Sequence, residues 1–289
     1  YSISAGQTTT ANITAKSLTV SGITASNKIY DGSTNVTLTG TAVYSGLVSG
    51  DTFDGTYTGA FSDKNAGVGK TVTITSSYSG ADVSNYSVTD QSSTTANITA
   101  KSLTVSGITA SDKIYDGSTS ATLTGTAVYS GLVSGDIFTG SYTGVFANAN
   151  VGTGKTVNIT PSYSGADVNN YSVTNQSSTT ADISAKVLTA TASASNKTYD
   201  GGTTASTTLT FTGLVGTETL GQTVGSTFDN KNVGSNKTVT VNSITLADGS
   251  GLAANYSISA GQTTTANITA KALTVSGITA SNKIYDGST

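Results

Sequence analysis

ANITAKSLTV, at residues 96–105, is the stretch that decides the fold of this 289-residue chain. Its apolar residues stand at even positions up to residue 100 and at odd positions from residue 103. Neighbouring residues of a β-strand point to opposite faces, so this change of parity moves the apolar set to the other face. We therefore predict that one strand ends and the next begins at Ala100–Lys101, with a twist or bulge and no flexible linker.

The same phrase returns at intervals of 85 residues, which predicts an array of small units rather than one large domain. The lysines that open each copy, and mark the expected joints, are Lys16, Lys101, Lys186 and Lys271. We expect 1–15 to be the C-terminal strand of a preceding module, 16–100, 101–185 and 186–270 to be three modules (the third divergent), and 271–289 to start another. Residues 1–34 and 256–289 differ only at Ser17 against Ala272, so we expect the chain to be a stretch of a longer polypeptide.

Within each unit the pattern is that of β-strands. Apolar residues such as Leu18 and Val20 alternate with threonine and serine, and Val72 and Ile74 do the same. Glycine- and aspartate-containing turns separate these runs, and no segment shows a helical period. About seven short strands in a unit of this size indicate an Ig-like antiparallel sandwich. The predicted fold class is all-β: tandem Ig-like antiparallel β-sandwich modules, joined without linkers into a rod.

The composition argues against several functions. The chain has no cysteine and no histidine, and its net charge is −3. Thiol chemistry is therefore excluded, a basic face for nucleic acid is not expected, and no apolar run approaches the length of a membrane span. Asp63 and Lys64 become Asn148 and Ala149 in the next unit, which suggests a solvated face rather than a catalytic pair. We expect no enzyme activity.

A Tyr-Asp-Gly turn occurs in every copy of the unit. Asp-Gly favours a tight turn, and the tyrosine could pack beneath it with its hydroxyl on a backbone partner. The alternative is a calcium site at the aspartates Asp31, Asp116 and Asp200, although no ligand run of alternating aspartates accompanies them. We therefore expect no cofactor, with calcium as the open alternative. The turn residues of the three full units are Tyr30, Asp31 and Gly32, Tyr115, Asp116 and Gly117, and Tyr199, Asp200 and Gly201.

A second tyrosine motif reads D-x-x-x-Y-x-V at Asp82, Tyr86 and Val88. Its spacing is similar to the tyrosine corner of Ig domains, with valine in place of cysteine. The alternative is a tyrosine on an ordinary strand without a special role. The third unit departs from the motif, since it has Leu252 in place of the aspartate. The tyrosines of this motif are Tyr86, Tyr171 and Tyr256.

These motifs together resemble a known family. KIYDGST at 28–34, 113–119 and 283–289, its variant KTYDGGT at 197–203, and NAGVGKTV at 65–72 with its two relatives are similar to the YDG-type (MBG-like) repeats of bacterial filamentous-haemagglutinin-like adhesins and surface proteins. The resemblance implies an extracellular, β-rich module on a bacterial surface or in a secreted protein. It supplies no catalytic residues.

We expect the chain to be a structural repeat region: a stiff spacer or filament of a long adhesin or surface fibre. The units at 16–100 and 101–185 differ at 18 of 85 positions, and a spacer has no need to diversify. The alternative is a set of weak multivalent modules for glycans or surfaces, in which Tyr44, Tyr57 and Tyr78 would stack on sugars. The expected partners are neighbouring copies of the repeat, with other chains in a fibre or surface glycans as open alternatives.

Overall fold

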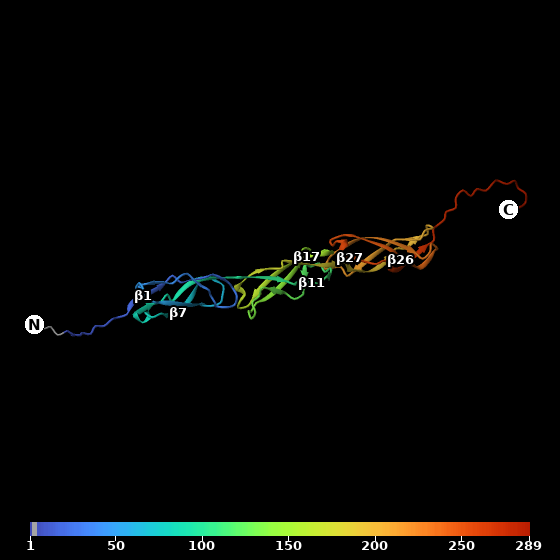
Figure 1. Cartoon of the computed structure of the whole chain (residues 1–289). Helices are drawn as coiled ribbons and strands as arrows, with labels where there is room; N and C mark the ends of the chain where they lie inside the picture. The colour runs from blue at the N-terminus through green and yellow to red at the C-terminus, as the bar shows by residue number, and fades with distance from the viewer. Residues whose placement is uncertain (2–4) are drawn as a thin grey trace. The chain divides into compact units, whose positions relative to one another are not determined.

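The computed structural model describes Tyr1 and residues 5–289 (Figure 1). The chain forms two compact units. The first repeat, 16–100, lies wholly in the first unit, and the third, 186–270, lies wholly in the second. The second repeat is divided between them. The first unit comprises Tyr1–Thr109, Leu123–Gly144 and Ile159–Thr179, and the second comprises Ala110–Thr122, Val145–Asn158 and Thr180–Thr289.

The first repeat is a β-sandwich whose two main sheets have the strand orders β5-β1-β8 and β3-β9-β7-β6. Its alternating residues form the core between them, because Val20 of β1 packs in one cluster with Ile74 of β7. The bounds are β1 Lys16–Ser21, β2 Thr24–Ala25, β3 Lys28–Ile29, β4 Leu38–Thr39, β5 Val43–Ser45, β6 Asp54–Phe61, β7 Gly67–Ser79, a 3₁₀ helix Val83–Asn85, β8 Tyr86–Thr89 and β9 Ser93–Thr99.

Two pairings in this repeat are parallel: Lys16 of β1 lies opposite Tyr86 of β8, and Lys28 of β3 lies opposite Ile98 of β9. The other main pairings, β1 with β5, β6 with β7 and β7 with β9, are antiparallel as predicted. The parallel pairs depart from the purely antiparallel expectation. Alternation along one strand shows which face is buried, but it carries no information about the direction of the neighbouring strand.

The joint between the first two repeats is a single residue. β9 ends at Thr99 and β10 begins at Lys101, so only Ala100 separates the strands. The buried residues change from even to odd positions at this joint. Ile98, before the joint, is 2% exposed, and Leu103, after it, is 0% exposed.

The second repeat contributes β15-β10-β18 to the first unit. In the second unit its β12 pairs in parallel with β19, as β3 does with β9. Its bounds are β10 Lys101–Ser106, β11 Thr109–Ala110, β12 Lys113–Ile114, β13 Ser120–Ala121, β14 Leu123–Thr124, β15 Val128–Ser130, β16 Thr139–Phe146, β17 Gly152–Ser164, a 3₁₀ helix Val168–Asn170, β18 Tyr171–Thr174 and β19 Ser178–Ser184.

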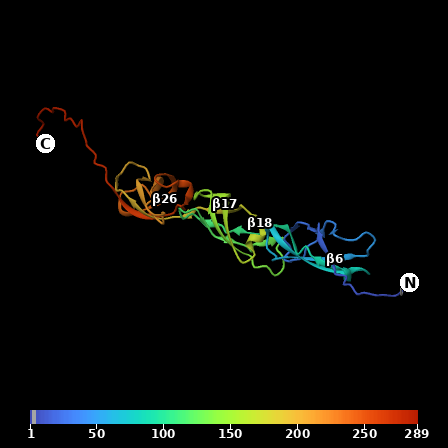
Figure 2. The same cartoon turned by 90° about the vertical axis from the view of Figure 1, so that its left-hand side faces the viewer.

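The third repeat has the same plan, and its longest strand is β26 (Figure 2). Its large sheet has the order β22-β28-β26-β25-β23, and β20 pairs with β27 and β21 with β24. The bounds are β20 Lys186–Val187, β21 Thr189–Ala194, β22 Lys197–Thr198, β23 Thr204–Ala205, β24 Thr207–Thr212, β25 Leu220–Phe228, β26 Gly234–Asp248, a 3₁₀ helix Ala253–Asn255, β27 Tyr256–Ser257 and β28 Thr263–Thr269.

The end segments carry no strand in residues 5–15 or 271–289 (Figure 1). Part of the strand expected in 1–15, residues 2–4, lies outside the described residues. The equivalent segment of the first repeat, β9, is a strand because β7 and β3 pair with it. Residues 5–15 make no such pairing in the structure.

In the part of the chain that the structure describes, regular structure consists of β-strands and three short 3₁₀ helices. The prediction of an all-β fold built from tandem sandwich modules is therefore confirmed. Within the same described residues, no helix combines the length and hydropathy needed to cross a membrane.

Candidate functional site

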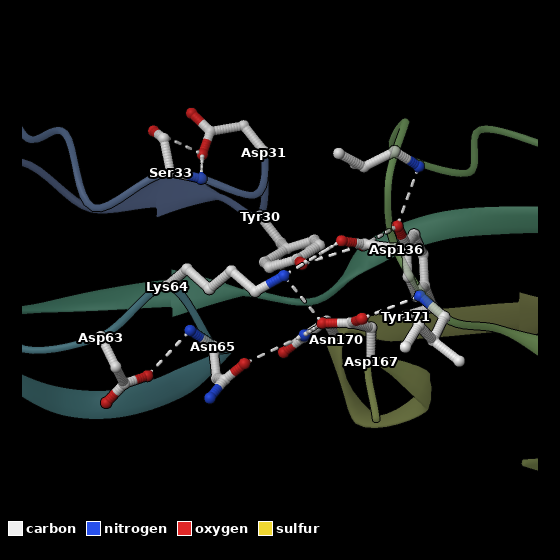
Figure 3. A network of polar contacts seen from close by, with 12 residues as sticks. Tyr30, Asp31, Ser33, Asp63, Lys64, Asn65, Asp136, Asp167, Asn170 and Tyr171 are labelled. Carbon is white, nitrogen blue, oxygen red and sulfur yellow. Dashed lines mark hydrogen bonds and ion pairs between the residues drawn. The ribbon is translucent and has the colours of Figure 1, made fainter. Parts of the chain in front are cut away.

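The candidate site is the contact between the first and second repeats, which lies inside the first unit (Figure 3). Tyr30 comes from the Tyr-Asp-Gly turn of the first repeat, and its hydroxyl donates to Asp136 of the second, 3.0 and 2.9 Å from the two carboxylate oxygens. Tyr171 of the second repeat donates to the same carboxylate at 2.5 Å. The Asp136 carboxylate therefore accepts hydrogen bonds from two tyrosines that belong to successive repeats.

The turn that presents Tyr30 is fixed by its own hydrogen bonds. Gly32 has φ +80°, a left-handed conformation that glycine adopts without steric cost. The Asp31 carboxylate accepts the Ser33 N–H at 2.9 Å and the Lys28 ammonium at 2.7 Å. Burial opposes ionisation of Asp31, but the hydrogen bonds from Lys28 and Ser33 hold its pKa below the usual range. The turn is thus a preformed support for the tyrosine.

Lys64 adds an ionic contact across the joint, and in Figure 3 its ammonium group points toward both acids of the second repeat. It lies 2.9 Å from Asp167 and 3.1 Å from Asp136. The two carboxylates are buried, whereas the lysine side chain keeps 38% of its surface exposed. The Ile137 N–H and the Lys64 ammonium lower the pKa of Asp167, and Asp167 and Asp136 raise the pKa of Lys64. The prediction that Lys64 belongs to a solvated face is therefore wrong.

Asn170 supplies the third polar contact across the joint. Its side-chain oxygen accepts the N–H of Ala66 at 2.8 Å, and its amide nitrogen donates to Asn65 at 3.2 Å. Asn170 is only 2% exposed. A buried amide that lost these partners would be left unsatisfied, so the contact fixes the orientation of one repeat on the next.

Apolar packing is continuous across the same joint. Tyr30, Leu103, Phe138 and Tyr171 belong to one buried cluster that also reaches the core of the first repeat. The rings of Tyr30 and Tyr171 meet edge to face, with centroids 5.6 Å apart and planes at 78°. This is the favoured geometry for an aromatic pair.

The joint between the second and third repeats lies inside the second unit and has the same plan. Glu218 accepts the hydroxyls of Tyr115 at 2.7 Å and Tyr256 at 2.5 Å. Asn255, also 2% exposed, accepts the Val151 N–H at 2.9 Å. Burial, together with the hydrogen bond to Glu218, raises the pKa of Tyr115 to about 12.

The two joints differ in one pair of positions. Lys64 and Asp167 of the first joint correspond to Ala149 and Leu252 of the second. The lysine and the aspartate are replaced together, although they stand in different repeats. The second joint therefore lacks this ion pair but keeps the tyrosine, carboxylate and asparagine contacts.

The structure brings some of the predicted tyrosines of the two motifs together at the joints. Tyr30 and Tyr171 meet on Asp136, and Tyr115 and Tyr256 meet on Glu218. Tyr86, in the first repeat, donates to Asp51. The hydroxyls of the motif tyrosines also accept the N–H of Val48, Val133 and Val215. These partners lie 38 to 41 residues upstream, far more than in the tyrosine corner of Ig domains.

The candidate calcium aspartates are each paired with a lysine. The Lys–Asp distances are 2.7 Å for Asp31, 2.7 Å for Asp116 and 2.8 Å for Asp200. A cation at one of these carboxylates would have to displace an ammonium group that also hydrogen-bonds the turn carbonyls. Among the described residues, no three acidic side chains are grouped as a metal site would require.

Sequence reasoning gave no role in a joint to the residues that complete the joints: Asp136, Lys64, Asp167 and Asn170. One signal could have revealed two of them. Lys64 and Asp167 change in step to Ala149 and Leu252, as positions in contact do. Asp136 gave no such signal because its counterpart Glu218 lies in a region where the third repeat has a different length.

Comparison with known proteins identifies the repeats. The family model of the YDG domain matches residues 14–96, 99–181 and 184–266. No curated protein matches the chain. The crystal structure of the I9–I11 tandem from titin is similar over 88% of this chain and 100% of that one, with 8% identity and a TM-score of 0.22, a likeness too weak to define the fold. The chain belongs to the YDG domain family and contains three tandem copies of that domain.

Proposed function

We propose that the chain is a stiff structural spacer in a long extracellular bacterial adhesin or surface fibre, and that it has no catalytic role. The observation that carries the proposal is the joint itself. A single residue separates consecutive strands, and Tyr30, Lys64 and Asn170 then tie the two repeats together through side chains. Repeats linked in this way lose the hinge freedom that a glycine- and serine-rich linker would give.

The multivalent glycan-binding alternative would need aromatic side chains on the surface. Tyr44 and Tyr78 instead pack on the buried Phe53, with ring centroids 5.2 and 5.0 Å away. The Tyr57 hydroxyl donates to the Tyr44 hydroxyl at 3.1 Å. All three tyrosines are half-buried and engaged with one another, which favours the spacer.

The proposal is tested by spin labels at Ser77→Cys and Ser162→Cys. These are exposed, equivalent serines of the first and second repeats, and the chain has no other cysteine. A stiff joint gives one narrow distance distribution. The control carries a glycine–serine insertion after Ala100 and should give a broad one. A broad distribution in the chain without the insertion would refute the spacer. Antibody labelling of intact cells tests the surface location.

A further inference from the structure

Each joint brings together two complementary faces. The outgoing face is the tyrosine of the Tyr-Asp-Gly turn with the three residues that correspond to 64–66. The incoming face is the shared carboxylate, the residue at the position of Asp167, and the asparagine and tyrosine that follow. In the first joint these faces are Tyr30, Lys64, Asn65 and Ala66 on one side and Asp136, Asp167, Asn170 and Tyr171 on the other.

The outgoing face of the third repeat, Tyr199, Lys231, Asn232 and Val233, differs from that of the first only in having valine in place of Ala66, but it is uncovered. Tyr199 is half-buried, whereas its counterparts Tyr30 and Tyr115 are 1% and 5% exposed. Leu273 is 87% exposed, while Leu103, at the same place after the first joint, is 0% exposed. A hollow on this face is lined by Tyr199, Asn232, Val233, Ala270, Lys271 and Leu273.

The residue that distinguishes the two kinds of joint is present on this face. Lys231 stands at the position of Lys64, where the second repeat has Ala149. We propose that the third repeat's outgoing face binds a further YDG repeat whose incoming face carries an aspartate at the position of Asp167, and that it discriminates against one with leucine there. The inference rests on the proposed function, because it assumes that repeats dock in series.

The first repeat shows that such an incoming face exists. Asp51, Asp82, Asn85 and Tyr86 correspond to the four residues that receive Tyr30 and Lys64 in the first joint. Asn85 is exposed, whereas Asn170 and Asn255 are 2% exposed within their joints. The face is thus assembled but uncovered, and its aspartate matches the charge of Lys231.

Charge explains why the match matters. Docking buries the acid, since Asp167 is 6% exposed, and a buried carboxylate without its cation is strongly disfavoured. An aspartate facing alanine would lose its ammonium partner. A lysine facing leucine would lose water and the acceptor that lies 2.9 Å from Lys64 in the first joint, and would keep only the shared carboxylate, which lies 3.1 Å away there. The Lys–Asp and Ala–Leu pairs are each self-consistent, and the mixed pairs are not.

The test extends the whole chain by one repeat. Residues 271–289 already match 16–34 except at Ala272, so adding a copy of residues 35–100 after Thr289 completes a fourth repeat. A second version carries Asp82→Leu in the added copy, and both are made with and without Lys231→Ala. The readout is hydrogen exchange at the Val233 N–H, whose counterparts at Ala66 and Val151 donate to buried asparagines.

We expect the Lys–Asp and Ala–Leu versions to protect the Val233 N–H about tenfold more than the two mixed versions. Exchange at the added copy's Val72, a core position, checks that the new repeat is folded in all four chains. Equal protection in the four chains would overturn the matching rule, and no protection in any of them would overturn the docking face. Concentration-dependent protection in the unextended chain would mean that a second copy occupies the face instead.

Failure of this inference is distinguishable from failure of the spacer. The spin-label experiment reads the first joint alone and does not involve Lys231. A narrow distribution there, combined with equal protection in the four extended chains, would leave the spacer standing and remove the matching rule.

Discussion

Tyr30 donates its hydroxyl hydrogen to Asp136, a residue 106 positions later in the chain and in the next repeat. The same carboxylate accepts Tyr171. This shared acceptor connects the Tyr-Asp-Gly turn of one repeat to the tyrosine motif of the following copy. Two features that look independent in the sequence are therefore the two halves of one joint.

Tyr30→Phe should weaken the first joint by about 1–2 kcal/mol, because it removes one hydrogen bond and leaves Asp136 less well satisfied. Denaturant unfolding of the intact chain measures the change. Tyr199→Phe is the matched control, since Tyr199 lies on the uncovered face of the third repeat, and it should have little effect. Equal losses from the two substitutions would show that the tyrosine acts within its own repeat.

Gly32→Ala should destabilise the chain more than Gly201→Ala. Both glycines have left-handed φ angles, +80° and +84°, so both substitutions carry a backbone cost of ~1–2 kcal/mol. An added methyl group at Gly32 would lie 3.0 Å from Val133 Cγ1 across the joint, whereas at Gly201 it meets nothing within 4 Å. The difference between the melting temperatures of the two variants measures the cost of the clash with Val133. Equal melting temperatures would contradict a contact across the joint at Gly32.

Lys64→Ala should loosen the first joint, because it leaves the buried Asp167 without its ammonium partner. Adding Asp167→Leu should recover part of the loss, since the double variant has the same residues as Ala149 and Leu252 of the second joint but leaves the Ile137 N–H without its acceptor. The stability of the double variant should also depend less on salt than that of the unmodified chain. A double variant no better than the single one would refute the pairing.

Acid should weaken the first joint through Asp167. Hydrogen bonds from the Ile137 N–H and Lys64 lower its pKa in the folded chain. Its contribution is therefore fully present above the unfolded pKa of ~3.9 and is lost as pH falls through the lower folded value. Below pH 4, the free energy of unfolding should depend less on pH in the double variant Lys64→Ala, Asp167→Leu than in the unmodified chain. An unchanged profile would exclude Asp167 as the titrating group.

Alkali should weaken both joints through their tyrosines. Burial and the hydrogen bonds to Asp136 and Glu218 raise the pKa values of Tyr171 and Tyr115 to about 12. A group with a raised folded pKa contributes stability below its unfolded pKa of ~10 and loses that contribution as pH rises toward 12. Ultraviolet titration should show these two tyrosines ionising late. Substitution of either by phenylalanine should remove one late-ionising group, and ionisation of both near pH 10 would contradict their burial.

The sequence by itself determined the repeat, the β-strands and the place of the joints. These are local properties: a period of 85 residues, alternating apolar positions, and a parity change beside Lys101. Each can be read along one segment, because the face that a strand residue occupies depends only on its position in that strand.

Only the tertiary structure decided the strand partners and the chemistry of the joints. Alternation is the same for parallel and antiparallel neighbours, so the parallel pairing of β1 with β8 could not be predicted. Lys64 looked like a surface charge because its partners, Asp136 and Asp167, are 72 and 103 positions away. The energy of such a contact depends on the distance between side chains in space, and the spacing of residues along the chain does not contain it.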